Sequence, residues 1–416
     1  MNTFFVLLTA ALLPICVFGQ SEIIKLTLNE AIEIGLRNNP EVRIAAENIS
    51  ASRGRFWSGI SLPRPEVGIS YEYVPKGSPV KHFGERMIGI SQSFDFPTTI
   101  LFRGMQLSSH VSIAEAEHSS TAAAITSRVK VAYYNMLARQ KKIVVKNEFL
   151  ALANDFARKA EIRYTVGEAT NLERLTAAVQ YTQARNALAV AQNDLKVSLG
   201  ELFFALGLTK QEQPDDVILT DTLIYQPITT TLEELTARAL SINPQLKASS
   251  GRIAVASLSR TLAWSSILPS FSASYYRQTV ANNSNYYGVS LGASIPLWFL
   301  FDQRGQIQEA SANLSIAESD FRSLNNYLIT EVRNAYLEVR NNERQIQLLQ
   351  TDILPQAEEV YRTALASYTS GEITYIEYLQ ARQILISSRN EYIDELARYY
   401  SSLSKLEYAV GTSIIQ

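Results

Sequence analysis

The chain carries one sequence pattern twice, at a shift of 204 positions. Asn39-Pro40 in the first copy returns as Asn243-Pro244 in the second. Further matched positions run through both copies: Leu28/Leu232, Glu30/Glu234, Leu36/Leu240, Tyr164/Tyr368, Gly167/Gly371, Glu168/Glu372, Thr170/Thr374, Arg185/Arg389, Asn186/Asn390, Leu202/Leu406, Ala205/Ala409 and Gly207/Gly411. A duplicated unit has to contain each kind of element that the fold uses. We therefore expect two similar halves, residues 21–207 and 208–416, that form one structure.

The first residues, 1–20, have the features of a secretory signal peptide. The apolar stretch Phe4 to Phe18 is too short for a membrane span, and small Gly19 follows it. No Lys or Arg precedes this stretch, so a single N-terminal membrane anchor is the alternative. Cleavage would remove Cys16, the only cysteine, and leave a chain without thiols.

Beyond this segment no apolar run approaches the roughly 20 residues that a membrane helix needs. An exported chain of this kind is either soluble or crosses a membrane as a β-barrel.

Each copy opens with a pair of helices. In the first copy we expect one helix within 22–39, with Thr27 or Asn29 as its N-cap. Pro40 ends that helix, because the residue before a proline avoids the helical region. A second helix is expected at 41–60.

Two segments then change to the alternation that is typical of β-strands. We expect β-hairpins at about 66–96 and about 270–296. Apolar residues in both alternate with small or polar ones, as in the run Val67-Gly68-Ile69-Ser70. One apolar face and one small, polar face are typical of a membrane barrel, with lipid outside and a lumen inside. Two hairpins in an ordinary soluble sheet are the alternative.

A long helical hairpin follows each β-hairpin, at 104–206 and at 305–411. Pro355 is the one proline inside these runs. A helix of about 60 residues spans roughly 90 Å, which is far more than a globular domain needs. Apolar residues at a spacing of seven predict coiled-coil packing between these helices.

Counting strands predicts an oligomer. Two hairpins give four strands per chain, whereas bacterial membrane barrels close with about eight or more. Two copies would give eight strands and three copies twelve, and the count alone does not choose between them.

Composition argues against several classes of protein. With 38 basic and 40 acidic residues, the chain lacks the excess of positive charge that nucleic-acid binding requires. His110 and His118 are eight positions apart, too far for the helical pairing of a metal site. We find no phosphate-binding loop and no nucleophile motif. The sequence therefore predicts no enzyme, no cofactor, no catalytic residues and no metal site.

The whole mature chain resembles the TolC family of outer-membrane efflux channels. The opening run from Leu26 to Glu41 looks like the amino-terminal motif of that family, and it returns at Leu232 to Pro244. The run Leu291 to Leu297, followed by Arg304-Gly305-Gln306-Ile307, is similar to the second crossover from strand to helix. The runs Tyr164 to Glu168 and Tyr368 to Glu372 look like the paired tips of the helical hairpins.

This resemblance implies an α+β channel-tunnel made by a homotrimer. Its twelve-stranded barrel lies in outer-membrane lipid, and its helical barrel extends into the periplasm. A periplasmic adaptor and an inner-membrane pump, of RND type, would complete a tripartite efflux system for small molecules or metal ions. The alternatives are the exit duct of a type I protein secretion system and, from a different class, a soluble periplasmic coiled-coil scaffold.

The resemblance also implies a gate at the periplasmic tip, made by acidic residues. Glu173 and Glu377 each stand six positions after a tip glycine and match acidic positions of the family. Gln380 stands nine positions after Gly371, where some members have another acid. A single ring at Glu377 is therefore the prediction. The alternative is that these acids are solvated side chains on a helix surface.

The tips are also the expected docking surface for the adaptor. The alternative is that they are structural turns only. The residues assigned to this surface are Tyr164, Gly167, Glu168, Thr170, Tyr368, Gly371, Glu372 and Thr374.

Overall fold

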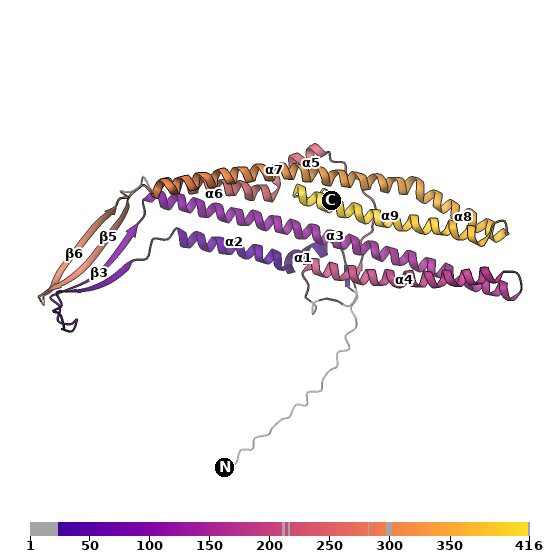
Figure 1. Ribbon diagram of the computed structural model, residues 1–416, viewed down its shortest axis with the longest axis horizontal. Helices are drawn as coiled ribbons and strands as arrows, with labels where there is room; N and C mark the ends of the chain where they lie inside the picture. Colours follow the sequence, from indigo (N-terminus) through magenta and orange to yellow (C-terminus); the bar gives the residue numbers. More distant parts are fainter. Residues whose placement is uncertain (1–23, 210–212, 215–216, 282, 297–301, 415–416) are drawn as a thin grey trace, which may run out of the picture.

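A computed structural model describes residues 24–209, 213–214, 217–281, 283–296 and 302–414. The predicted signal peptide at 1–20 lies outside these residues. The molecule is long and narrow, with a four-stranded sheet at one end and helices that run side by side along the rest (Figure 1). An α+β architecture with very long helices is therefore confirmed.

The elements follow one another in the order that the duplication predicts. The first half contains β1 (Ile24–Leu26), α1 (Leu28–Asn38), α2 (Pro40–Gly59), β2 (Glu66–Glu72), β3 (Glu85–Phe94), α3 (Pro97–Thr165) and α4 (Asn171–Leu206). The second half contains β4 (Val217–Leu219), α5 (Leu232–Ile242), α6 (Pro244–Ser265), β5 (Ser270–Val280), β6 (Asn283–Ser294), α7 (Asp302–Leu348), the π-helical turn η1 (Leu349–Ile353), α8 (Leu354–Ser370) and α9 (Tyr375–Val410).

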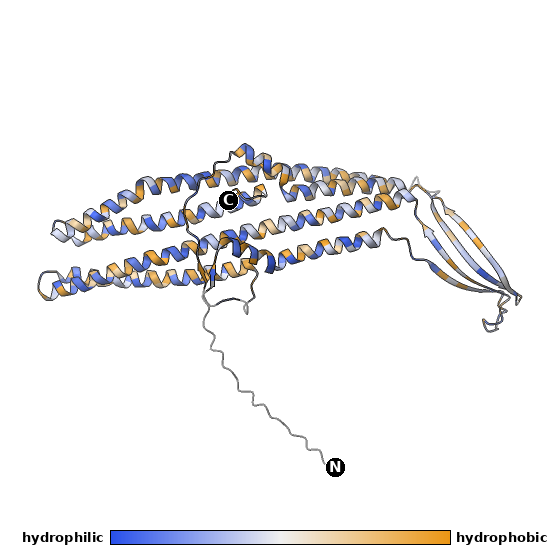
Figure 2. Ribbon diagram, turned by 180° about the vertical axis from the view of Figure 1, so that it is seen from behind, coloured by the Kyte–Doolittle hydropathy of each residue, from blue (hydrophilic) through white to orange (hydrophobic). Residues whose placement is uncertain are grey.

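The four-stranded sheet joins the two halves of the chain. Its strand order is β2-β3-β5-β6, and every neighbouring pair is antiparallel. Val67 lies opposite Ile90, which lies opposite Tyr275, so apolar side chains share one face. Gly68 lies opposite Gly89 on the other face. Apolar and small or polar residues accordingly alternate along the strands (Figure 2).

The residues shared by the two copies make the same contact in each half. The Asn39 side-chain amide donates to the Ala205 carbonyl at 3.2 Å, and that of Asn243 donates to the Ala409 carbonyl at 2.9 Å. Both asparagines are buried and also cap the helix that follows them. Each contact fastens the start of one helix to the end of the long helical hairpin, so the repeated Asn has a packing role.

One expected helix boundary was confirmed and one was wrong. The first helix begins at Leu28, with Thr27 as its N-cap in a capping box with Glu30. The residues before it form β1, which pairs in parallel with β4, a sheet that the sequence analysis did not predict. Helix α3 begins at Pro97, earlier than residue 104, because proline is favourable in the first turn of a helix.

Pro355 does not simply lie within one continuous α-helix. The chain widens into the π-helical turn η1 just before it, and α8 then begins with Pro355 in its first turn. Because proline has no N–H, one carbonyl of the preceding turn loses its helical donor, and a π-turn accommodates this change in the helix. Within the described residues, no helix has both the length and the apolar character that crossing a membrane requires.

The helical tips as the candidate gate

Two tight turns end the helical hairpins at the end of the molecule farthest from the sheet (Figure 1). Gly167, between α3 and α4, and Gly371, between α8 and α9, both have φ of +82°. A Cβ added at either position would find no heavy atom within 4 Å. Glycine is therefore required there for its left-handed backbone and not for lack of space.

A threonine begins the helix after each turn. The Thr170 hydroxyl accepts a hydrogen bond from the Glu173 amide at 3.2 Å, and the Thr374 hydroxyl accepts one from the Glu377 amide at 3.4 Å. Each hydroxyl satisfies an N–H that the first helical turn leaves without a helical partner. The sequence therefore builds both tips by the same local means.

The Glu377 carboxylate is fully exposed and folds back on its own cap. It accepts hydrogen bonds from the Thr374 amide at 2.7 Å and from the Thr374 hydroxyl at 2.9 Å. These bonds, the backbone one above all, lower the pKa of Glu377 below its ordinary value. The carboxylate is therefore ionised at neutral pH in the single chain.

Glu377 and Gln380 line one groove of about 470 Å³ between α8 and α9. The opposite wall of this groove comes from α8 and includes Val360, Thr363 and Ser367. Two of the three predicted gate residues therefore lie together on the same face of α9.

Glu173, the third predicted gate residue, is held in a different place. Its Oε1 accepts hydrogen bonds from the Tyr368 hydroxyl at 2.9 Å and from Arg163 Nη1 at 3.2 Å. Only 18% of its side chain is exposed. Arg163 and Glu173 belong to the first helical hairpin and Tyr368 to the second, so this cluster fastens the two hairpins together near the tip.

The protonation state of Tyr368 favours this contact. Burial, and then the hydrogen bond to the Glu173 carboxylate, raise the pKa of Tyr368 to about 12. The phenol therefore keeps its proton and remains a donor at every physiological pH.

An aromatic cluster between the hairpins was missed by the sequence analysis. Phe156 on α3 stacks on Tyr375 with ring centroids 4.4 Å apart, and Tyr378 stacks on Tyr368 at 5.4 Å. Tyr361 completes the cluster at 6.1 Å from Tyr378. Tyr361, Tyr368 and Tyr375 follow one another at intervals of seven, and this spacing is the signal that could have found them.

A buried arginine continues the same seam and was also missed. Arg382 lies seven positions after Tyr375 and has 5% of its surface exposed. It donates to the side-chain oxygen of Gln180 on α4 at 3.3 Å. It is thus a second polar link between the two helical hairpins.

The residues assigned to adaptor docking lie around the two turns. Tyr164 is 40% exposed, with the Arg174 guanidinium 5.1 Å from the centroid of its ring. The Glu168 side chain is 71% exposed. Glu372 is exposed and accepts a hydrogen bond from the Ser367 hydroxyl at 3.1 Å. The tip therefore presents carboxylates and an aromatic ring to solvent.

The chemistry offered by the tip is electrostatic. In the parts of the chain that the structure describes, no group of three or more His, Cys, Asp or Glu could hold a metal ion. Of the histidines, His82 lies in the loop after β2, and His110 and His118 lie on α3, all far along the molecule from the tip.

A sheet of long antiparallel strands, joined end-on to such helices, defines the protomer of an outer-membrane channel-tunnel. The chain matches the model of the family described as outer membrane efflux protein over residues 31–208 and 235–412. The two matched segments are related by the same shift of 204 positions, since 235 minus 31 and 412 minus 208 both give 204. This chain belongs to the outer membrane efflux protein family. It is an exit duct of the outer membrane that extends into the periplasm.

Two curated relatives come from Pseudomonas putida. They are the toluene efflux pump outer membrane protein TtgF and SepC, described as a probable efflux pump outer membrane protein. Each is 22% identical over 410 residues, which covers 92% of this chain and 83% of the relative.

Solved structures share the fold over nearly the whole chain. A membrane protein from Pseudomonas aeruginosa superposes with a TM-score of 0.78 at 17% identity, covering 94% of this chain and 92% of that one. The CmeC outer membrane channel of Campylobacter jejuni gives 0.76 at 15% identity, with coverage of 92% and 85%. VceC of Vibrio cholerae gives 0.74 at 17% identity, with coverage of 93% and 97%.

Proposed function

We propose that three copies of this chain close a twelve-stranded barrel and act as the passive exit duct of a tripartite efflux pump. In this proposal the pump is of RND type and its cargo consists of small molecules. The small-molecule cargo is supported by the name of the relative TtgF, a toluene efflux pump outer membrane protein. The duct itself catalyses no reaction, because the energy for transport comes from the pump.

The unpaired edges of the sheet carry this proposal. Strands β2 and β6 are the two edges of the four-stranded sheet, and within the described residues no further strand pairs with the outer side of either. An open edge of this kind needs a neighbour, and in a membrane it needs closure. The β6 of one copy pairing with the β2 of the next would satisfy both edges.

An apolar row on α4 supports contact between copies. Val190, Val197 and Phe204 follow at intervals of seven and are 51%, 63% and 74% exposed. Val197 and Phe204 also line a groove of about 590 Å³ between α3 and α4. Apolar side chains at this spacing are typical of a coiled-coil seam, so a helix of a second copy is the partner that fits them.

The gate of the proposed duct is the tip. Three copies of Glu377 around a threefold axis would form a ring of negative charge that favours cations. Gln380 lies beside it in the same groove and adds polar groups without charge. The cluster of Arg163, Glu173 and Tyr368 would hold the two hairpins of each copy in the closed arrangement.

The docking surface for the adaptor follows from the same geometry. We assign it to the two turns, with the exposed residues Tyr164, Gly167, Glu168, Thr170, Gly371, Glu372 and Thr374 and the half-buried Tyr368. The hydroxyl of Tyr368 is already engaged by Glu173. No observation favours a protein secretion system over an efflux pump.

One experiment tests the duct directly. The full-length protein is extracted from outer membranes, its mass is measured by size exclusion with light scattering, and it is inserted into planar bilayers. A trimer that gives ion-conducting steps supports the proposal. A monomer, or a trimer that never conducts even after the tip residues are altered, contradicts it.

A further inference from the structure

Two arginines lie on the apolar face of the sheet. In the strand register, Arg86 on β3 lies opposite Tyr71 and Thr279, and Arg277 on β5 lies opposite Ile88 and Tyr287. Residues directly opposite each other share a face, so both arginines lie on the same face as the apolar residues of the sheet. Arginine on the lipid-facing side of a barrel costs about 2–4 kcal/mol at mid-membrane and much less near the interface.

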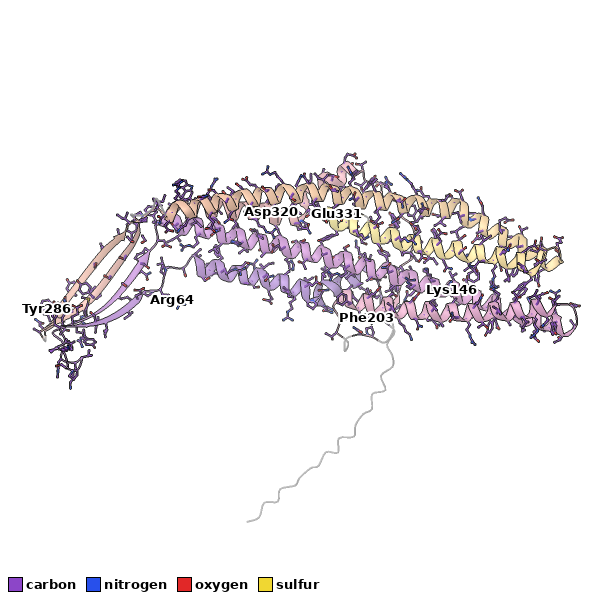
Figure 3. All side chains as sticks on the ribbon, viewed as in Figure 1. Arg64, Lys146, Phe203, Tyr286, Asp320 and Glu331 are labelled. Carbon is purple, nitrogen blue, oxygen red and sulfur yellow. The ribbon has the colours of Figure 1, made fainter. Side chains whose placement is uncertain are left out.

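Both arginines belong to the end of the sheet that lies away from the helices. Arg86 is the second residue of β3, and Arg277 is three positions before the end of β5. The loops at that end lie near Tyr286, whereas Arg64 marks the end next to the helices (Figure 3). Since the helices extend into the periplasm, the two arginines lie at the outer surface of the membrane.

Aromatic residues lie beside Arg86 and directly across the strands from Arg277. Arg86 lies 5.5 Å from the centroid of the Phe83 ring, and that ring lies 5.3 Å from Tyr71. Tyr287, opposite Arg277, has its ring 6.2 Å from that of Tyr275. Girdles of aromatic residues mark the level at which a membrane barrel meets the lipid headgroups.

In the part of the chain that the structure describes, no carboxylate forms an ion pair with either arginine. Within the described residues, neither guanidinium lies within 4.0 Å of an acidic side chain; Arg86 donates to the Thr279 hydroxyl at 3.5 Å. Glu72 and Glu85 lie opposite each other at this end of the sheet, but alternation places them on the other face. The loop 73–84 adds Lys76 and Lys81 and has no acidic residue. At this end of the sheet the two arginines and the two glutamates therefore lie on opposite faces.

We propose that Arg86 and Arg277 bind the phosphate groups of an anionic glycolipid headgroup in the outer leaflet. They are diagonal neighbours on one face, at the roughly 7–8 Å that such pairs span in a sheet, so both can reach one phosphorylated headgroup. The planar guanidinium binds phosphate through paired hydrogen bonds. The inference rests on the closed barrel proposed above, because only closure fixes which face meets lipid.

The test measures lipid binding by the purified full-length protein. Lipid A, which carries two phosphates, is titrated against the protein in neutral detergent, and bound lipid is counted by native mass spectrometry. We expect the double variant Arg86→Gln/Arg277→Gln to bind lipid A at least about tenfold more weakly. Arg64→Gln is the matched control, because it removes the same charge at the opposite end of the sheet, and its binding should not change.

Two further arms separate the possible ligands. Dephosphorylated lipid A should bind the wild-type protein as weakly as lipid A binds the double variant. Inorganic phosphate at millimolar concentration should not displace lipid A; displacement would show a site for the free ion and overturn the proposal. Equal binding of lipid A by the wild type and the double variant would overturn it as well.

Folding and duct function are checked on the same samples. The double variant should keep the trimer mass and the single-channel conductance, so loss of lipid binding is distinguishable from failure of the duct. If the double variant does not assemble, Arg277→Gln alone is used, since no hydrogen bond of Arg277 to another described residue would be lost. A weakening of about threefold is expected from it, and no change would count against the proposal.

Discussion

The two copies place equivalent acids in different surroundings. Glu173 and Glu377 correspond under the shift of 204 positions, but Arg163 in the first copy corresponds to Ser367 in the second. Arg163 pairs with Glu173 and, with Tyr368, draws it into the contact between hairpins. Ser367 is too short to reach Glu377, which stays exposed on its own cap. With these different neighbours, Glu173 lies in the contact between the hairpins and Glu377 lies exposed at its own cap.

Removing the charge of Glu377 should change ion selectivity. We expect Glu377→Gln to reduce the preference for potassium over chloride, measured as the reversal potential of single channels in a salt gradient. Glu372→Gln removes a charge from the same turn outside the groove and should leave the reversal potential nearly unchanged. An unaltered reversal potential in Glu377→Gln would show that the ring does not face the pore.

The selectivity should also depend on pH in one direction. In the single chain the hydrogen bonds from Thr374 lower the pKa of Glu377, which favours its charged form. Cation preference should therefore be present at neutral pH and decline as the pH falls and the carboxylates take up protons. Thr374→Ala removes the hydroxyl that donates to the carboxylate, so the decline should begin at a higher pH in this variant.

The hydrogen bond between Tyr368 and Glu173 should stabilise the closed tip. A hydrogen bond to a charged group contributes about 1.5–3 kcal/mol to stability, and the Tyr368–Glu173 contact is partly exposed to solvent. We expect Tyr368→Phe and Glu173→Gln to raise the probability of open channels, and the double variant to add little to either single change. Purely additive effects in this cycle would mean that the two side chains act independently.

At the scale of elements, glycine is required at the helix ends for two distinct reasons. Gly167 and Gly207 both have positive φ, +82° and +71°. A Cβ at Gly207 would lie 2.6 Å from the Asn39 Cα, whereas one at Gly167 would meet nothing. The first position therefore requires only a left-handed backbone, and the second requires in addition that α2 can begin beside it.

Alanine at these two glycines should have unequal effects. Gly167→Ala should lower the free energy of unfolding by about 1 kcal/mol, because an L-residue is strained in a left-handed backbone conformation. Gly207→Ala should lower the melting temperature clearly more, because backbone at Asn39 has to move. Circular dichroism of the detergent-solubilised trimer during heating measures both. Equal losses would show that the contact between Gly207 and Asn39 is easily relieved.

The long helices were predictable because their cause is local. Runs without proline and a spacing of seven predict α3, α4 and α9, and Gly371 and Thr374 predict the turn and the cap. The small sheet of β1 and β4 was not predictable, because its strands have three residues each and pair across 193 positions from Ile24 to Val217. The contact of Tyr368 with Glu173 could not be predicted either, since it depends on how two hairpins pack.

At the scale of the whole molecule, the single chain is incomplete. Its sheet has two open edges, and its α4 helix exposes an apolar row that has no partner within the described residues. Association with further copies of the chain would satisfy both features, because it would pair the edge strands and cover the exposed helix.

Charge on the α4 row should prevent assembly. We expect Val197→Asp to shift the detergent-solubilised protein from trimer to monomer in light scattering, because a carboxylate would be buried without a partner. Val197→Ala removes only two methyl groups and should still form the trimer. A trimer of unchanged stability in Val197→Asp would place this row on an outer surface instead.

The sequence by itself determined the duplicated plan, the alternating strands and the long helices with their capped turns, because these depend on residues near one another in the chain. The class of protein followed from them, since few other chains combine such strands with such helices. Only the tertiary structure decided that Glu173 joins the two hairpins while Glu377 contacts its own cap, and that Arg86 and Arg277 are neighbours on the apolar face of the sheet. Those contacts join segments far apart in sequence, and their geometry is fixed by strand register and helix packing, which no local pattern records.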